Sequence, residues 1–277
     1  TAKNLARLGA TTALISVVGN DDAGGRMRDV LRQEYVEPLI VTDQERPTTE
    51  KIRYLQKGHQ LLRVDFEEQG PLAADSERAV LAILAERTRA CDALVVSDYA
   101  KGVLTPVIAG KIVAGAQAAG IVLAVDWKPK NARQFRGASF VSPNLKEARE
   151  FLAASGPSDT ERVNELAAQV STALDADVYL TLGEQGIYVY SRADGRGSLL
   201  PQLHAQEVSD VSGAGDTALA VLTLATVAGA SPSEAAELAN AGAAVVVAKV
   251  GAVALSPEEL LGVFDRVPKW AEQNART

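Results

Sequence analysis

The sequence is poor in the residues that build redox and metal centres. Its 277 residues contain one cysteine, Cys91, so neither an intrachain disulfide nor a cysteine-based zinc site can form, which suits a reducing compartment. The two histidines, His59 and His204, lie in unrelated segments and give little support to a histidine metal site or a His-containing catalytic triad. Any metal would therefore be bound through oxygen.

Long apolar runs and an excess of positive charge are also absent. No uninterrupted apolar stretch reaches the roughly 20 residues that span a bilayer, and no secretory signal opens the chain, so we expect no membrane association and a cytoplasmic location. The 35 acidic residues outnumber the 28 lysines and arginines, and the basic residues are scattered. This pattern argues against duplex nucleic acid as a partner, and an anionic ligand has to be met by local groups.

Short apolar runs alternate with helical stretches along most of the chain. Runs of strand length cover 13–18, 93–97, 121–125, 138–141 and 178–182. Helical patterning covers 23–33, 75–89, 105–119, 144–154 and 159–173, and the last third is mostly helical over 213–229, 231–249 and 256–265. The alternation is typical of βαβ units around a parallel sheet. SPSE at 231–234 and SPEE at 256–259 predict capping boxes with proline at the first helical position.

Residues 49–67 break this rhythm, because polar and apolar side chains alternate there. The polar set is Lys51, Arg53, Arg63 and Asp65, and the apolar set is Ile52, Tyr54, Leu62, Val64 and Phe66. The alternation predicts a β-hairpin with one solvated face, turning near 57–60. An inserted hairpin is either an edge flap or a lid, and its apolar face needs a partner, such as a second copy of the chain.

The most informative segment is DVSGAGD at 210–216, which leads from an extended run into an apolar helix. Small residues let backbone N–H groups turn toward one point, and a helix N-terminus adds partial positive charge, so an anion is favoured there. Asp216 lies at the same point and can take a proton from an attacking hydroxyl. This interpretation predicts phosphoryl transfer. The alternative is a tight glycine loop in which Asp216 only caps the helix.

Two other glycine-rich segments lack a phosphate-binding signature. GNDDAGGR at 19–26 has the glycine spacing of a P-loop without its Lys-Ser/Thr end, and no G-x-G-x-x-G follows the first strand. GEQG at 183–186 lies between a predicted strand and the apolar run 187–190, and it predicts a hairpin turn.

Polar side chains follow the predicted strands. Asn144 and Glu147 begin a helix with their oxygens on one face, so they form either a capping box or a donor set for Mg²⁺, directly or through water. In a parallel sheet the carboxyl ends of the strands line the ligand crevice. We therefore expect six strand-end residues to converge, namely Asp98, Lys101, Asp126, Lys128, Asn144 and Gly183.

The order of these motifs resembles the ribokinase-like (PfkB) sugar kinases over essentially the whole chain. DVSGAGD matches the C-terminal signature of the family, with Val221 where a small residue is usual, and Ala2, Gly9 and Gly19 match the second half of its N-terminal signature. The first half would fall before residue 1, and residues 1–8 read as a helix with no strand before it. We therefore expect the natural chain to begin earlier.

Four longer segments resemble the heptose 7-phosphate kinases of this family. They are RPTTEKIR at 46–53, QLLRVDFE at 60–67, SDYAKG at 97–102 and SPNLKE at 142–147, while WKPK at 127–130 and KGH at 57–59 depart from the usual PKG and RNQ. The resemblance implies ATP-dependent phosphorylation of the C1 hydroxyl of D-glycero-β-D-manno-heptose 7-phosphate, for ADP-heptose and lipopolysaccharide core synthesis. The alternatives are another sugar or sugar-phosphate kinase, such as a 1-phosphofructokinase, and a non-catalytic sugar-phosphate-binding relative.

The resemblance also implies roles for individual residues. Asp216 would be the catalytic base, with the amides of Gly213, Ala214 and Gly215 as the anion hole. The nucleotide would be bound by Asn144 and Glu147, through Mg²⁺, and by Thr181, Gly183, Gly186 and Asn240. The sugar phosphate would be met by Lys51, Arg53, Gln60, Arg63, Asp98, Lys101 and Lys128. A monovalent cation such as K⁺ would lie near Asp210, Ser212 and Gly251.

The implied architecture is a three-layer α/β fold with a mostly parallel central sheet, helices on both faces and a small β-hairpin lid. We expect residues 1–35 and 68–277 to form the kinase core and residues 36–67 to form an inserted lid. The lid would also join two copies of the chain as a homodimer.

Overall fold

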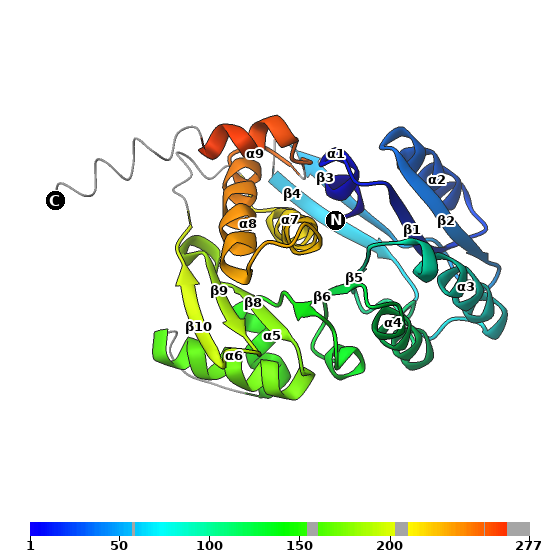
Figure 1. The fold of residues 1–277 in the computed structure, drawn as a ribbon. Coiled ribbons are helices and arrows are strands. Elements are labelled where there is room, and N and C mark those ends of the chain that lie inside the picture. The colour runs from blue at the N-terminus through cyan, green and yellow to red at the C-terminus, as the bar shows by residue number, and fades with distance from the viewer. Residues whose placement is uncertain (57–58, 154–159, 203–209, 252, 265–277) are drawn as a thin grey trace.

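A six-stranded sheet runs through the middle of the molecule in the order β10-β9-β8-β7-β6-β5 (Figure 1). The computed structural model describes residues 1–56, 59–153, 160–202, 210–251 and 253–264. Four neighbouring strands are parallel, namely β5 (Ala93–Ser97), β6 (Val122–Asp126), β7 (Phe140–Val141) and β8 (Asp177–Thr181). β9 (Ile187–Ser191) and β10 (Arg196–Leu200) add an antiparallel edge. The predicted mostly parallel sheet is confirmed.

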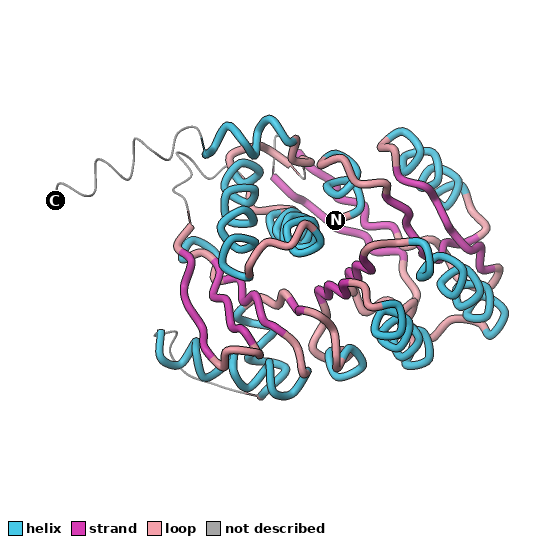
Figure 2. Tube along the Cα trace, viewed as in Figure 1, coloured by secondary structure: helices cyan, strands magenta, loops and turns pink. Residues whose placement is uncertain are grey.

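Helices cover both faces of this sheet (Figure 2). One layer contains α3 (Ala74–Arg87), α4 (Pro106–Ala119), α5 (Leu145–Leu152) and α6 (Thr160–Leu174), and the other contains α7 (Ala214–Val227), α8 (Pro232–Val247) and α9 (Pro257–Phe264). Short 3₁₀ turns lie at Thr88–Ala90, Ala132–Phe135 and Gly183–Gln185. Among the described residues, no helix is both long and apolar enough to cross a membrane.

Two separate hydrophobic cores result from the alternation of side chains along the strands. Leu123 and Val125 of β6 enter the core shared with α3 to α6, whereas Ala124 between them enters the core shared with α7 and α8. β8 repeats the pattern, with Leu180 on the first side and Tyr179 on the second. Side chains of period two thus bury both faces, which is why these strands read as continuous apolar runs.

Local capping sets the start of several helices. Ser231 and Glu234 form a reciprocal capping box at α8, and Ser256 and Glu259 exchange the same two hydrogen bonds at α9 (3.1 and 3.3 Å). Both predicted boxes are therefore confirmed. Thr105 caps α4 with its side chain, and proline at the first position has a backbone that already suits a helix.

The N-terminal part forms a small sheet of its own. β1 (Thr12–Gly19) pairs in parallel with β2 (Val36–Asp43), and α2 (Asp22–Gln33) connects them. Asp21 caps α2 through Gly24 N–H (2.8 Å) and accepts the backbone N–H of Thr48 (2.8 Å), so the rejected P-loop segment is a structural junction. The expected insertion 36–67 thus contains a strand that pairs with β1 and a hairpin that forms a third sheet. The division into core and lid stays a prediction.

The hairpin consists of β3 (Glu50–Gln56) and β4 (His59–Phe66). The pairs Lys51↔Asp65 and Arg53↔Arg63 share one face, and Ile52↔Val64 and Tyr54↔Leu62 share the other, so the predicted polar and apolar faces are confirmed. The apolar side chains remain exposed in the single chain, with Tyr54 at 52% and Leu62 at 55%. A monomer therefore leaves a hydrophobic surface on this hairpin uncovered.

One buried side chain joins α1 to two distant segments of the chain. Asn4 in α1 (Ala2–Arg7) donates to the hydroxyl of Thr217 in α7 (3.0 Å), and its carbonyl oxygen accepts the backbone N–H of Leu255 (3.1 Å). Hydrogen bonds satisfy both ends of this buried amide, which makes the contact specific. α1 is thereby fixed against the beginning of α7.

Candidate active site at the carboxyl ends of the strands

The predicted convergence of strand ends is present in the structure. Asp98 follows β5, Asp126 ends β6, and Asn144 after β7 forms a β-bridge with Thr181 at the end of β8. These strands are parallel neighbours, so their carboxyl ends share one edge of the sheet. Asp98, Glu147 and Asp216 lie near enough to Asp126 for their charges to raise its pKa.

Asp98 makes hydrogen bonds within the protein. It is 3% exposed, and its two carboxylate oxygens accept hydrogen bonds from Ala100 N–H (2.6 Å), Asn131 Nδ2 (2.8 Å) and Lys128 N–H (3.3 Å). These bonds fasten the loop after β5 to the loop after β6. A contact of Asp98 with a sugar hydroxyl stays a prediction, and the structure gives Asp98 a role in shaping both loops.

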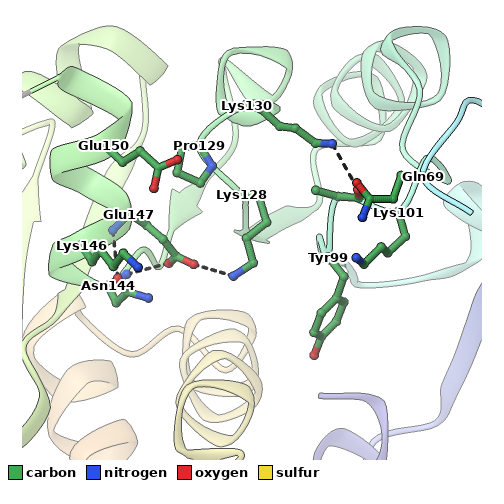
Figure 3. A pocket seen from close by; sticks show the side chains of 11 residues that line it. Gln69, Tyr99, Lys101, Lys128, Pro129, Lys130, Asn144, Lys146, Glu147 and Glu150 are labelled. Atoms are coloured by element: carbon green, nitrogen blue, oxygen red, sulfur yellow. Dashed lines mark hydrogen bonds and ion pairs between the residues drawn. The ribbon is translucent and has the colours of Figure 1, made fainter. Parts of the chain in front are cut away.

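Asn144 and Glu147 form the capping box that begins α5. Glu147 N–H donates to Asn144 Oδ1 (2.9 Å), and Asn144 N–H donates to Glu147 Oε2 (3.1 Å). The other oxygen, Glu147 Oε1, accepts from Lys128 Nζ at 2.5 Å, as Figure 3 shows. The capping alternative is therefore realised, and it leaves one carboxylate oxygen facing Lys128.

Negative charge is crowded around Asp126. Burial, and next the charge of Glu147, raise the pKa of Asp126 to about 7, while Lys128 opposes this shift. Burial alone would lower the pKa of Lys128, but the hydrogen bond and charge of Glu147, with Asp126, outweigh it and raise that pKa. A cation at this place relieves carboxylate repulsion.

This donor set is compatible with Mg²⁺. Across the described ranges, no cluster of three or more His, Cys, Asp or Glu side chains could hold a metal by itself. The carboxylates of Asp126 and Glu147 nevertheless supply the hard oxygen atoms that Mg²⁺ prefers, and Mg²⁺ commonly completes its shell with water and substrate phosphates. Glu147 and Asn144 would hold the ion through water.

Asp216 lies in the first turn of α7, the helix that packs against β5 and β6. The N-cap is Gly213 with φ +85°, and no side chain caps this end, so Asp216 does not have the capping role weighed as an alternative. Its carboxylate accepts a hydrogen bond from the hydroxyl of Thr1. A donor can therefore reach this carboxylate from the direction of α1.

The loop before α7 carries the amides that are predicted to form the anion hole. Ala214 N–H makes a turn hydrogen bond to Val211 O (3.3 Å), and the first intrahelical bond runs from Thr217 N–H to Gly213 O (2.9 Å). The N–H groups of Gly215 and Asp216 belong to the first turn, where a helix has no acceptor of its own for them. They add to the positive end of the helix dipole, and an anion is favoured there.

The three residues predicted near a monovalent cation are together in the structure. Asp210 accepts hydrogen bonds from Ser212 N–H (2.9 Å) and Gly251 N–H (3.1 Å), one on each carboxylate oxygen. Ser212 chiefly, with Gly251, lowers the pKa of Asp210. The carboxylate thus stays ionised and ties the loop before α7 to the segment after α8.

Three of the predicted nucleotide residues, Thr181, Gly183 and Gly186, lie around the β8–β9 turn. Thr181 ends β8, and the segment 183–186 turns the chain into β9, as predicted. A Cβ on Gly186 (φ +102°) would lie 2.2 Å from Leu200 O, so glycine is required there. Asn240 is buried in α8 and donates to Leu200 O (2.9 Å), which fastens the end of β10. Its place near an adenine stays a prediction.

The predicted cations of the hairpin are held by acidic partners. Lys51 pairs with Asp65 and Glu67 (both 2.9 Å), Arg63 pairs with Asp65 (2.9 Å), and Lys101 from the loop after β5 pairs with Glu67 (2.6 Å). Lys101, and next Lys51, lower the pKa of Glu67 to about 2. Arg53 is exposed on the polar face of β3. Gln60 lies in β4, and its side chain is outside the described residues.

Two contacts at the base of the hairpin were not predicted. Arg46 Nη2 donates to the carbonyl oxygens of Glu68, Gly70 and Lys101 at 3.0 to 3.3 Å, and a Cβ on Gly102 would lie 1.8 Å from Gly70 O. Arg46 and Gly102 belong to two of the four segments quoted above, but their contact joins positions far apart in sequence. They bind the hairpin to the loop after β5.

A pocket of about 510 Å³ opens between α5 and the loop after β5 (Figure 3). In that view, Asn144 and Glu147 lie on one side, and Tyr99, Lys101 and Gln69 lie on the other. Its charged lining comprises Lys101, Lys128, Lys130, Lys146, Glu147 and Glu150. Lys130 and Lys146 were not predicted, although Lys130 belongs to the unusual WKPK segment. The four lysines outnumber the two glutamates of the lining, which favours an anion there, and Lys101 and Lys128 are each already paired with a glutamate.

Solved structures with the same fold include two kinases. The phosphofructokinase-2 from Escherichia coli in complex with potassium aligns with a TM-score of 0.78 at 19% identity, over 96% of this chain and 85% of that one. The ribokinase from Arabidopsis thaliana complexed with ribose and ATP aligns with a TM-score of 0.76 at 19% identity, over 95% and 84%. The fold is therefore ribokinase-like.

The family profile described as pfkB family carbohydrate kinase matches residues 1–259, so the chain belongs to that family of kinases. Among similar proteins, the bifunctional protein HldE of Caulobacter sp. (strain K31) is 40% identical over 264 residues, and that of Caulobacter vibrioides is 41% identical over 265 residues. They cover 95% and 94% of this chain. The chain spans 53% of the length of each of these relatives.

Proposed function

We propose that the chain phosphorylates the C1 hydroxyl of D-glycero-β-D-manno-heptose 7-phosphate with ATP, giving the 1,7-bisphosphate. The observation that carries this proposal is the meeting of the four segments that resemble heptose 7-phosphate kinases. Arg46 of the first contacts Lys101 of the third, Lys101 pairs with Glu67 of the second, and Glu147 of the fourth lines the same pocket as Lys101. Similarity to HldE proteins over nearly the whole chain supports it.

In this mechanism Asp216 accepts the proton of the C1 hydroxyl as that oxygen attacks the γ-phosphorus of ATP. The bond from the γ-phosphorus to its bridging oxygen breaks, and ADP leaves. The N–H groups of Gly213, Gly215 and Asp216 would face the charge that develops on the transferred group, while the N–H of Ala214 is bonded to Val211 O. Bound Mg²⁺ would neutralise the phosphate oxygens, with Asn144 and Glu147 holding it through water.

The substrate's 7-phosphate needs cations outside the anion hole. The pocket beside α5 offers Lys101, Lys128, Lys130 and Lys146, and the polar face of the hairpin offers Lys51, Arg53 and Arg63. Thr181, Gly183, Gly186 and Asn240 would shape the nucleotide site. K⁺ near Asp210 would follow the potassium complex of the E. coli phosphofructokinase-2.

The hairpin would act as a lid and as the contact between two copies of the chain. Its exposed apolar face supports the second role, and the charged base that links Glu67 to Lys101 supports the first. The product would enter ADP-heptose and lipopolysaccharide core synthesis. Since ATP is the phosphoryl donor, we place the reaction in the cytoplasm.

A coupled ADP-release assay over a panel of sugar phosphates tests the substrate. The panel contains the heptose 7-phosphate in both anomeric forms, fructose 1-phosphate, fructose 6-phosphate and ribose. We expect turnover of the β-anomer of the heptose phosphate at the highest kcat/KM. Robust turnover of a fructose phosphate with none of the heptose phosphate would remove the heptose assignment and keep a sugar-phosphate kinase.

A further inference from the structure

Lys128 pairs with Glu147, one of the two residues proposed to hold magnesium, and it faces two different surroundings. On one side its Nζ donates to Glu147 Oε1 at 2.5 Å, and on the other side it lines the four-lysine pocket across from Tyr99 and Lys101 (Figure 3). Its side chain is 37% exposed, so it has room to turn. Glu147 is 12% exposed and is fixed through its capping bonds.

The two oxygens of Glu147 are unequal. Oε2 accepts from the backbone of Asn144 and completes the cap of α5, whereas Oε1 accepts from Lys128. Oε1 is thus the oxygen that is open to Mg²⁺ or to a water bound to it. The ammonium of Lys128 and the magnesium ion would repel each other at this oxygen. Binding of a magnesium nucleotide at Glu147 and pairing with Lys128 therefore compete.

The charges around Lys128 allow it to leave Glu147. Lys128 compensates Glu147 and Asp126, which stand next to Asp98 and Asp216. When Glu147 engages a magnesium nucleotide, the carboxylates keep a counter-charge and Lys128 loses its partner. The pocket that Lys128 lines is then the nearest place where it can meet a new anion, with Lys101, Lys130 and Lys146 around it.

We propose that Lys128 exchanges partners during the reaction cycle: it pairs with Glu147 in the free enzyme and turns to the phosphate of the acceptor once Glu147 engages a magnesium nucleotide. Each ligand then strengthens the binding of the other by the same factor, as linkage requires. This proposal rests on the proposed function, since it takes a phosphorylated acceptor. Lys128 is a positioning residue in this scheme, and it couples the two substrates.

Calorimetry of acceptor binding tests the coupling without turnover. Heptose 7-phosphate is titrated into the chain with the non-hydrolysable analogue AMP-PNP, with and without Mg²⁺. In the wild type, we expect Mg²⁺ to lower the Kd of the acceptor about fivefold, at the lower end of usual coupling factors. In Glu147→Gln, the amide oxygen can still accept the hydrogen bond that caps α5, but the side chain no longer holds Lys128. Without Mg²⁺, heptose 7-phosphate should therefore bind this variant about fivefold more tightly than it binds the wild type.

The variant Lys128→Met gives the reciprocal measurement, which does not need the acceptor. Because this variant lacks the competing ammonium, we expect Mn²⁺ to bind about fivefold more tightly to the chain with AMP-PNP. Electron paramagnetic resonance measures the Mn²⁺ affinity. The matched control is Lys130→Met, because Lys130 lines the same pocket and donates to Ala100 O (3.2 Å). It weakens acceptor binding equally with and without Mg²⁺ and leaves Mn²⁺ affinity unchanged.

Two results overturn the exchange. One is an unchanged Mg²⁺-free acceptor affinity in Glu147→Gln, and the other is an unchanged or weaker Mn²⁺ affinity in Lys128→Met. Wild-type chain from the same preparation is assayed for phosphoryl transfer. If transfer to the heptose phosphate is present and either result is found, only the exchange fails. If transfer is absent, the proposed function fails, and the Mn²⁺ titration still decides the competition at Glu147.

Discussion

Asp216 carries the chemistry of the proposed reaction at the scale of single residues. The N-terminus of α7 lacks a side-chain cap, so the carboxylate is not used to hold the helix. We expect Asp216→Asn to lower the rate of phosphoryl transfer by at least about 100-fold, the usual contribution of a general base, with little change in nucleotide binding. A steady-state assay with ATP and the heptose phosphate measures this.

The control for that substitution is Asp29→Asn on the surface of α2, where the carboxylate is 68% exposed. It removes the same charge far from the site and should leave kcat unchanged. A fall of less than about 100-fold in Asp216→Asn would mean that Asp216 is not the base.

Asp126 predicts a pH dependence of stability. Its pKa is 3.8 in the unfolded chain and about 7 in the fold, because of burial and the carboxylates of Glu147, Asp216 and Asp98, against the opposing charge of Lys128. Because its pKa is higher in the fold than in the unfolded chain, Asp126 contributes its full stabilisation at pH values below 3.8. The contribution is lost as the pH rises toward 7.

The variant Asp126→Asn isolates this effect. Each pKa unit corresponds to about 1.4 kcal/mol, and after allowance for solvent screening we expect the variant to gain about 2 kcal/mol over the wild type between pH 5 and pH 8. Urea unfolding of both proteins at the two pH values gives the difference. An equal change in the free energy of unfolding of both proteins would show that Asp126 has its ordinary pKa in the fold.

At the scale of elements, the hairpin depends on one close backbone contact. Gly102 has φ +84°, and a Cβ there would lie 1.8 Å from Gly70 O, at the point where Arg46 also binds. We expect Gly102→Ala to lower the free energy of unfolding by about 3 kcal/mol, since backbone strain and overpacking add. Urea unfolding measures the loss.

Gly195 offers a matched control for the backbone term. It lies between β9 and β10 with φ +61° and has nothing within 4 Å of its Cβ position. Gly195→Ala should therefore cost only the strain of a left-handed residue, about 1 kcal/mol. Equal losses in the two variants would mean that the contact with Gly70 does not constrain the hairpin.

For the whole molecule, the uncovered apolar face of the hairpin predicts assembly. Leu62 is exposed on that face beside Tyr54, and Arg63 next to it points to the polar face. We expect the wild type to sediment as a dimer at micromolar concentration and Leu62→Glu to sediment as a monomer. Arg63→Gln, on the opposite face, should keep the dimer. A wild-type chain that is monomeric with full activity would remove the hairpin contact between copies.

Local patterns predicted much of this molecule, because their causes lie within a few residues. The capping boxes at Ser231 and Ser256 and the two faces of the hairpin follow from nearest-neighbour geometry. Pairing between distant segments has no such local signal. The parallel partner of β1, the edge strand β10 and the separate β1–β2 sheet were therefore not predicted.

The candidate site shows the same division. Convergence of Asp98, Asp126 and Asn144 follows from the rule for parallel strands, and the position of Asp216 in the first turn of a helix follows from its glycines. The ion-pair partner of each charged side chain does not follow from such a rule. Lys128 pairs with Glu147 and Lys101 pairs with Glu67 only because the fold places separate loops side by side.

The hydrogen bonds of Asn4 have a consequence for how the chain is made. Asn4 is translated 213 residues before Thr217 and 251 residues before Leu255. At about 5–20 residues per second on the ribosome, the delay to Leu255 is roughly 10–50 s, and for most of it α1 has neither partner. The packing of α1 against the beginning of α7, the helix that carries Asp216, is therefore completed only after Leu255 has been synthesised.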